Sequence, residues 1–203
     1  LPHADNPPVG AVLYYRLGSK PSAPVTIDIL DLSGKLVRHM TSEAPKKFAD
    51  PAPAIPDFWV DPRAPLPTEV GLNRVNWDIR HDMPDAFVHD PQDNMNAVEG
   101  QVSPGIPGPL ALPGKYTARL TVDGVSYEQT FEVKNDPRSQ TKLGDLKTQH
   151  QLFMSQVEAS KIAYDGFLQA TALRAALSES LESKVKEVSE AAKSFDTKVK
   201  NLM

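Results

Sequence analysis

The sequence contains no cysteine. This absence excludes disulfide bonds, zinc–thiolate centres, iron–sulfur clusters and cysteine nucleophiles. No apolar run approaches the roughly 18 residues that a membrane-spanning helix needs, so the sequence predicts no membrane span. An excess of basic charge is also missing, because 22 Lys and Arg residues stand against 26 Asp and Glu residues, with a formal net charge of -4. We therefore do not expect nucleic acid as a partner.

Motifs for catalysis are missing as well. The sequence has no Gly-x-Ser-x-Gly nucleophile elbow, and no pattern singles out a pair of glycosidase carboxylates. The glycine-bearing stretch "GIPGPLALPG" (105–114) is interrupted by proline, which lacks the N–H group that a phosphate-binding loop needs. The sequence therefore predicts no catalytic residue and no cofactor, and we expect that the chain is not an enzyme.

Proline is absent from the last third of the chain. All 19 prolines lie at or before Pro137. Alternating apolar and polar residues dominate before this point, and helical periodicity dominates after it. The composition therefore predicts a linker at 1–8, a β domain at 9–136 and a helical hairpin at 137–203.

Six segments of the predicted β domain alternate apolar and polar residues with a period of two, which is typical of half-buried strands. They are AVLYYRL, VTIDILD, KLVRHM, NRVNWDI, YTARLTV and VSYEQTFEV. The link Asp123-Gly124 between the last two segments favours a tight hairpin, because both turn residues need a positive φ. The pattern predicts a mainly β fold with an α tail, in which an Ig/fibronectin-III-like antiparallel β-sandwich precedes a long helical hairpin. The predicted structural core includes the inward-facing aromatic residues Trp77, Tyr116, Tyr127 and Phe131.

Two long proline-rich connections, 42–70 and 80–112, interrupt the predicted strands. Long loops of this kind are usually functional or disordered. The first contains Phe58 and Trp59, whose rings suggest a carbohydrate- or surface-binding module by stacking on a sugar. The other interpretation is that these rings close the end of the sandwich or face a neighbouring domain.

The second connection is rich in aspartate and histidine. A Ca²⁺ site needs six to eight converging oxygens. This connection has aspartate oxygens, but its aspartates do not have the spacing of an EF-hand loop. A zinc site needs more imidazoles than His81 and His89 provide. We expect this connection to be a solvated polar loop. The alternatives are that it holds a Ca²⁺ ion, or that residues 81–93 serve a hydrolase or a metal-binding protein. The metal candidates are Asp82, Asp85, Asp90 and Asp93.

The last 67 residues show helical spacing. We expect helices at about 142–177 and 181–202, with the serine-rich stretch "LSESLES" between them. The first would be about 50 Å long. The second has an a/d seam, which we expect to pack on the first helix or to mediate self-association. The seam consists of Leu181, Val185, Val188, Ala192, Phe195, Val199 and Leu202.

Three stretches resemble a known module, namely "VTIDILDLSGKLVRHM", "GLNRVNWDIR" and "LPGKYTARLTVDGVSYEQTFEVKNDPR". They are similar to the sandwich at the C-terminal end of bacterial secreted β-propeller proteins with BNR/Asp-box repeats, often labelled sortilin-like or glycosyl-hydrolase-like. More distantly, they resemble the Ig-like domain of the flagellar hook-capping protein. The matching positions are Asp31 to Gly34, then Gly71, Asn73, Trp77 and Asp78, then Pro113, Gly114 and Tyr116.

The resemblance implies an extracytoplasmic protein, periplasmic, secreted or on the cell surface. It also implies a non-catalytic accessory domain that packs on or positions an N-terminal β-propeller of the same polypeptide. The chain has no Asp-box of its own. It opens with "LPHADNPPVG" and without an initiator Met, so we expect a piece of a longer or processed protein.

Overall fold

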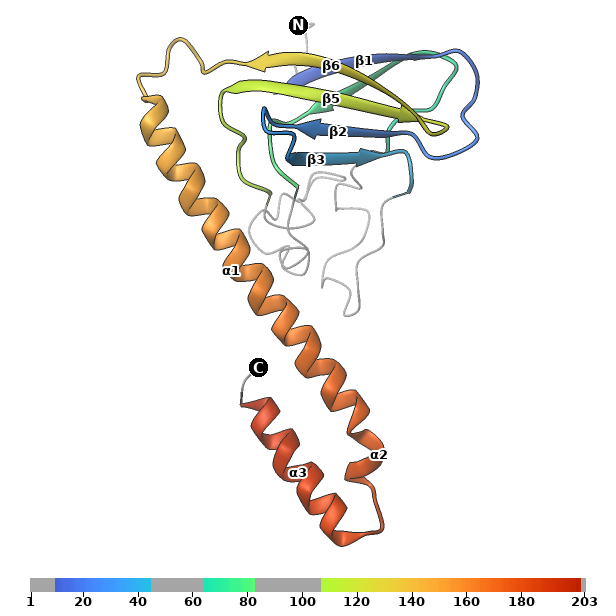
Figure 1. Ribbon diagram of the computed structural model, residues 1–203, viewed down its shortest axis with the longest axis vertical. Helices are drawn as coiled ribbons and strands as arrows, with labels where there is room; N and C mark the ends of the chain where they lie inside the picture. Colours follow the sequence, from blue (N-terminus) through green and yellow to red (C-terminus); the bar gives the residue numbers. More distant parts are fainter. Residues whose placement is uncertain (1–9, 45–63, 83–106, 202–203) are drawn as a thin grey trace, which may run out of the picture. The chain divides into compact units, whose positions relative to one another are not determined.

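The computed structural model describes residues 10–44, 64–82 and 107–201. It shows antiparallel β-sheets followed by C-terminal helices (Figure 1), which confirms the predicted order of β then α. The chain divides into two compact units, Leu1–Met154 and Ser155–Met203. Helix α1 begins in the first unit and ends in the second.

In the described part of the first unit, six strands form two sheets. The larger sheet has the order β3-β2-β5-β6, and the smaller sheet pairs β1 with β4. Every pairing is antiparallel. The strands are β1 (Ala11–Leu17), β2 (Thr26–Leu30), β3 (Leu36–Thr41), β4 (Gly71–Trp77), β5 (Gly114–Val122) and β6 (Val125–Val133).

The two sheets share one hydrophobic core. Period-two alternation directs Leu17 of β1 and Ile29 of β2 into it, since successive side chains of a strand point to opposite faces. Trp77, at the end of β4, is fully buried, and its ring packs edge-on against Tyr116 at 5.2 Å and Phe131 at 5.9 Å between ring centres. The indole of Trp77 thus joins the smaller sheet to β5 and β6 of the larger one.

Tight turns connect the strands as the sequence predicts. In the β5–β6 link, Asp123 and Gly124 have φ values of 47° and 81°. The Asp123 carboxylate also accepts hydrogen bonds from the backbone N–H groups of Ser22 and Ala23. In the β2–β3 link, the Asp31 carboxylate accepts hydrogen bonds from the backbone N–H groups of Ser33 and Lys35. Short aspartate side chains therefore hold both turns.

Strand β4 ends at Trp77, two residues before the predicted segment ends. The backbone turns at Ile79, whose φ is 56°, a conformation that β-branched residues rarely adopt. Asp78 accepts a hydrogen bond from the N–H of Arg80 in this turn. The Trp77 indole N–H donates to the carbonyl of Arg80 at 2.9 Å. The polar stretch after Trp77 thus begins as a turn fastened to the core.

Three helices follow the sheets: α1 (Leu143–Ala176), α2 (Ser178–Leu181) and α3 (Lys186–Lys200). The serine-rich stretch at 177–183 forms the short α2 and the turn into the following segment. Helices α1 and α3 are joined by an ion pair in which Arg174 Nε lies 2.6 Å from Asp196 Oδ1. Among the described residues, no helix is long and apolar enough to cross a membrane.

Candidate functional site

A groove of about 360 Å³ opens in the first unit beside the β2–β3 turn. The start of β5, the turn after β4 and the first turns of α1 complete its walls. Both charged and apolar side chains reach it. The lining residues are Asp31, Leu32, Ser33, Val37, His81, Leu112, Gly114, Lys115, Tyr116 and His150.

Two histidines face each other in this groove. The rings of His81 and His150 have centres 5.0 Å apart and planes tilted by 39°. His150 Nδ1 lies 3.0 Å from the carbonyl oxygen of Leu110, which favours the tautomer with a proton on Nδ1. Burial, helped by the neighbouring His150 and Lys35, lowers the pKa of His81 to about 4. The His81 imidazole is therefore neutral at pH 7.

The backbone around His81 is held from two sides. Its N–H donates to the carbonyl of Pro109 at 2.9 Å. Its own carbonyl accepts a hydrogen bond from the Arg38 guanidinium at 3.2 Å. Gly108 lies so close that a Cβ there would stand 2.2 Å from the His81 carbonyl oxygen, so only glycine fits. The position of His81 is thus set by the contacts of its backbone with Arg38, Gly108 and Pro109.

Two other polar groups of the groove, those of Asp31 and Tyr116, are engaged in hydrogen bonds of the fold. Hydrogen bonds from Ser33 and from the backbone of Lys35 lower the pKa of Asp31. The Tyr116 hydroxyl donates to the carbonyl of Leu112, and burial raises the pKa of Tyr116. Within the described ranges, no three His, Cys, Asp or Glu side chains come together to hold a metal ion. The arrangement offers the neutral imidazole of His81 in a fixed setting beside the ring of His150.

Most of the predicted binding residues lie outside the described residues, namely Phe58, Trp59, Asp85, Asp90 and Asp93. Asp82 is described, and its carboxylate is engaged by β3. Its Oδ2 accepts a hydrogen bond from the N–H of His39 at 2.9 Å, and its Oδ1 lies 3.6 Å from Arg38 Nε. Asp82 therefore fastens the segment after β4 to β3.

The aromatic residues predicted for the core divide into two groups. Trp77 and Tyr116 are buried, and Phe131 packs against the same core. Tyr127 is 60% exposed, so its assignment to the core was wrong. Although it points to the same side of β6 as Phe131, it lies four residues away on a strand that, among the described strands, pairs with β5 alone. Alternation identified its face, but it does not show how far the opposite sheet extends.

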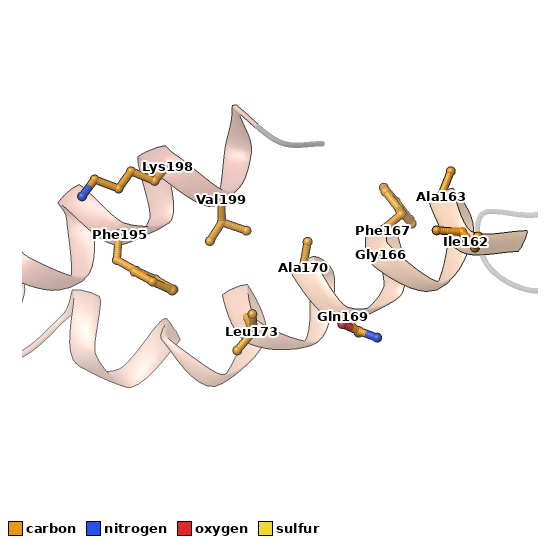
Figure 2. Close-up of a pocket in the computed structure, with 10 residues that line it drawn as sticks. All are labelled: Ile162, Ala163, Gly166, Phe167, Gln169, Ala170, Leu173, Phe195, Lys198 and Val199. Atoms are coloured by element: carbon orange, nitrogen blue, oxygen red, sulfur yellow. The ribbon is translucent and has the colours of Figure 1, made fainter. Parts of the chain in front are cut away.

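A second groove, of about 630 Å³, lies between α1 and α3 in the helical unit. Figure 2 shows Phe195 and Val199 of α3 on the side turned toward α1, opposite Ala170. The turns of α1 that carry Ile162, Ala163 and Phe167 extend past the end of α3 (Figure 2). Apolar side chains dominate this groove, and Lys198 is the one charged residue among those that line it.

The pairing of His81 with His150 was not predicted from the sequence. The two residues are 69 positions apart, and no motif links them. His150 lies in the segment at about 142–177 that the sequence predicts as a helix. The signal that could have identified it is a polar ring in this helix, where the helical spacing places apolar side chains on one face.

The protein was also compared with known proteins. No protein-family model, no curated protein and no solved structure matches the chain. The resemblance to the sandwich of propeller proteins therefore rests on the sequence motifs alone.

Proposed function

We propose that this chain is a non-catalytic accessory module of an exported bacterial protein. In this proposal the two sheets form an Ig/fibronectin-III-like sandwich, and the helices form a hairpin that packs on or positions a neighbouring domain. The sequence motifs favour an N-terminal β-propeller of the same polypeptide as that neighbour. Two antiparallel sheets that share one core support the assignment of a sandwich.

The observation that carries the proposal is the exposed apolar surface of the helices. Counting only the part of the chain that the structure describes, none of the 34 residues of α1 is buried. Large apolar side chains nevertheless occur around its circumference. Those that are at least 46% exposed are Leu143, Leu152, Phe153, Ile162, Phe167, Leu168 and Leu173. A helix that is apolar on several sides is normally covered by other protein.

The groove beside the β2–β3 turn supports a structural role for the first unit. Asp31 and Tyr116 are bonded to the nearby backbone, and Asp82 is bonded to β3. Hydrogen bonds of this kind fix turns and strand ends. They use the groups that general acid–base catalysis would need within reach of a substrate.

Hydrogen–deuterium exchange tests the proposal. The whole native protein that contains this chain is compared with the isolated chain, diluted until its own exchange no longer depends on concentration. We expect the amides of α1 to exchange more slowly in the whole protein, because a covered helix opens less often. Equal exchange in both samples would contradict the accessory role. The β2 amides serve as the internal control, since Ile29 is already fully buried in the isolated unit.

A further inference from the structure

The helical unit has too small a core for its size. Its 49 residues, Ser155–Met203, bury only Ala192, Asp196 and Val199 among the side chains that the structure describes. One of these three is a carboxylate. Units below about 70–80 residues rarely gain more than ~3–5 kcal/mol from a core, and they usually need a staple or a partner. No cysteine is available for a disulfide.

The same unit exposes the apolar surface that a partner would cover. Six large apolar side chains of the unit other than Leu168 are between 44% and 65% exposed, namely Ile162, Phe167, Leu173, Val185, Val188 and Phe195. At roughly 80–100 Å² each, they present about 500 Å², the larger part of the ~800 Å² per partner of a standard interface. Four of them line the groove between α1 and α3.

Small residues line one side of this groove. Ala163, Gly166 and Ala170 follow one another along one side of α1 at spacings of three and four residues, which allows a second helix to approach closely. Ile162 and Phe167 flank these small residues as large projecting side chains (Figure 2). In an antiparallel two-fold arrangement, the large side chains of one copy lie over the small residues of the other.

The charge of the unit favours a copy of itself over a charged partner. Ser155–Met203 contains seven basic and seven acidic residues, which gives a formal net charge of zero. Two copies therefore do not repel each other through net charge, and a net charge near zero promotes association. A strongly acidic or basic partner would find only Lys198 in the groove.

We infer that the groove between α1 and α3 binds the same groove of a second copy of this chain, so that the two helical units form a symmetric bundle. This inference rests on the proposed function, because it identifies one of the surfaces that the helices contact. It leaves the opposite side of α1, which carries Leu168, for the neighbouring domain. Leu168 lies two residues beyond Gly166, about 200° around the helix axis.

The test is the mass in solution of the full chain, measured by light scattering and by sedimentation over a wide range of concentration. We expect twice the 22.2 kDa of the chain at high concentration and a return to 22.2 kDa on dilution. Ile162→Glu places a charge in the groove at a side chain that is 65% exposed, and we expect it to give a monomer. Leu168→Glu makes the same change outside the groove, and we expect it to dimerise like the wild type.

Several outcomes would overturn the inference. They are a monomer at every concentration, a larger oligomer, or equal masses for the two variants. If either variant loses helical circular dichroism, dimerisation is tested instead by amide hydrogen exchange of the wild-type chain at several concentrations. The amides of residues 162–173 must then become more protected as its concentration rises. A monomeric chain whose α1 is still protected in the whole native protein would refute the second copy while leaving the accessory role intact.

Discussion

At the scale of single residues, burial separates side chains that the sequence pattern treats alike. Tyr116 and Tyr127 both lie on inward-facing positions of the β5–β6 hairpin, yet one is 7% exposed and the other 60%. Tyr116 also packs against Trp77 and bonds to the carbonyl of Leu112. The pair is therefore a matched test of where the core ends.

We expect Tyr116→Ala to lower the free energy of unfolding by about 3 kcal/mol, because it removes a buried ring and its hydrogen bond. Tyr127→Ala should change it by no more than about 0.5–1 kcal/mol, since the ring is largely in water. Urea unfolding followed by tryptophan fluorescence measures both. Equal effects of the two substitutions would show that the core extends to Tyr127.

The stability of the first unit should depend on pH through His81. In the unfolded chain a histidine takes up a proton near pH 6.5, whereas burial beside His150 and Lys35 lowers the pKa of folded His81 to about 4. The unfolded state then binds more protons, so stability is lost as the pH falls from about 6.5 to about 4. The carboxylate of Asp31 has the opposite, weaker influence on His81.

Melting temperatures measured by tryptophan fluorescence between neutral pH and pH 4 test this expectation. His81→Gln should flatten the pH dependence, because the unfolded chain then has one fewer group to protonate. His39→Gln, which removes an exposed histidine paired with Asp28, should retain it. A wild-type melting temperature that stays constant over this interval would contradict the assigned environment of His81.

At the scale of elements, the turns are the parts that sequence chemistry specifies best. Asp123-Gly124 predicts the hairpin because positive φ is easy for glycine and tolerable for aspartate. The strands are also predicted well, because the period-two alternation of apolar and polar residues reflects which face of each strand meets the core. The Trp77 segment was correctly recognised as a strand that enters a polar turn.

Substitution of Gly124 measures the cost of this turn. Gly124→Ala should destabilise the first unit by about 1 kcal/mol, because alanine disfavours the φ of 81°. No atom lies within 4 Å of the added methyl group among the described residues, so the cost is one of backbone conformation. Gly18→Ala is the control, since Gly18 has an ordinary φ and open surroundings. Equal stability of the two variants would contradict the hairpin geometry.

The attachment of α3 to α1 depends on Asp196. Its carboxylate bridges Arg174 at 2.6 Å and Lys200 at 3.0 Å, and these partners, Arg174 first, hold the pKa of Asp196 below its usual value. Asp196→Ala leaves the Arg174 guanidinium without this partner. We expect faster amide exchange throughout α3.

Glu190→Ala provides the control for Asp196. It removes a carboxylate from the same helix, but one whose ion pair with Lys186 is exposed and 3.8 Å long. Exposed pairs of this kind contribute little to stability. If the two substitutions accelerated exchange in α3 equally, the bridge would have no special role in joining the helices.

At the scale of the whole molecule, the sequence predicted the order of sheets and helices but not how the two grooves are built. Alternation and proline content are local properties, and they reveal strands and helices directly. The meeting of His81 with His150 depends on where the chain returns after long connections, which no local pattern encodes. The apolar positions of α1 were visible in the sequence, yet their exposure depends on which parts of α1 other elements contact, which is a property of the tertiary structure.

The division into two units predicts two unfolding transitions. Trp77 is buried in the core that the two sheets share, so its fluorescence reports on the sheets, whereas circular dichroism at the helical wavelength reports mainly on the second unit. We expect different midpoints by the two probes. Dilution should lower only the helical midpoint, because dimerisation stabilises only the unit that associates. Coincident midpoints under all conditions would indicate one cooperative body.

Strand β6 has a consequence for handling the protein. It is nine residues long, lies at the edge of its sheet, and leaves Val125 and Tyr127 more than half exposed. A long regular edge with apolar side chains is a template for fibrillar aggregation, which charged residues normally prevent. Glu128, paired with Arg119, and Glu132 interrupt this edge. The charges of these two glutamates therefore keep the protein soluble. Removing both charges would make the protein aggregate through this edge during storage.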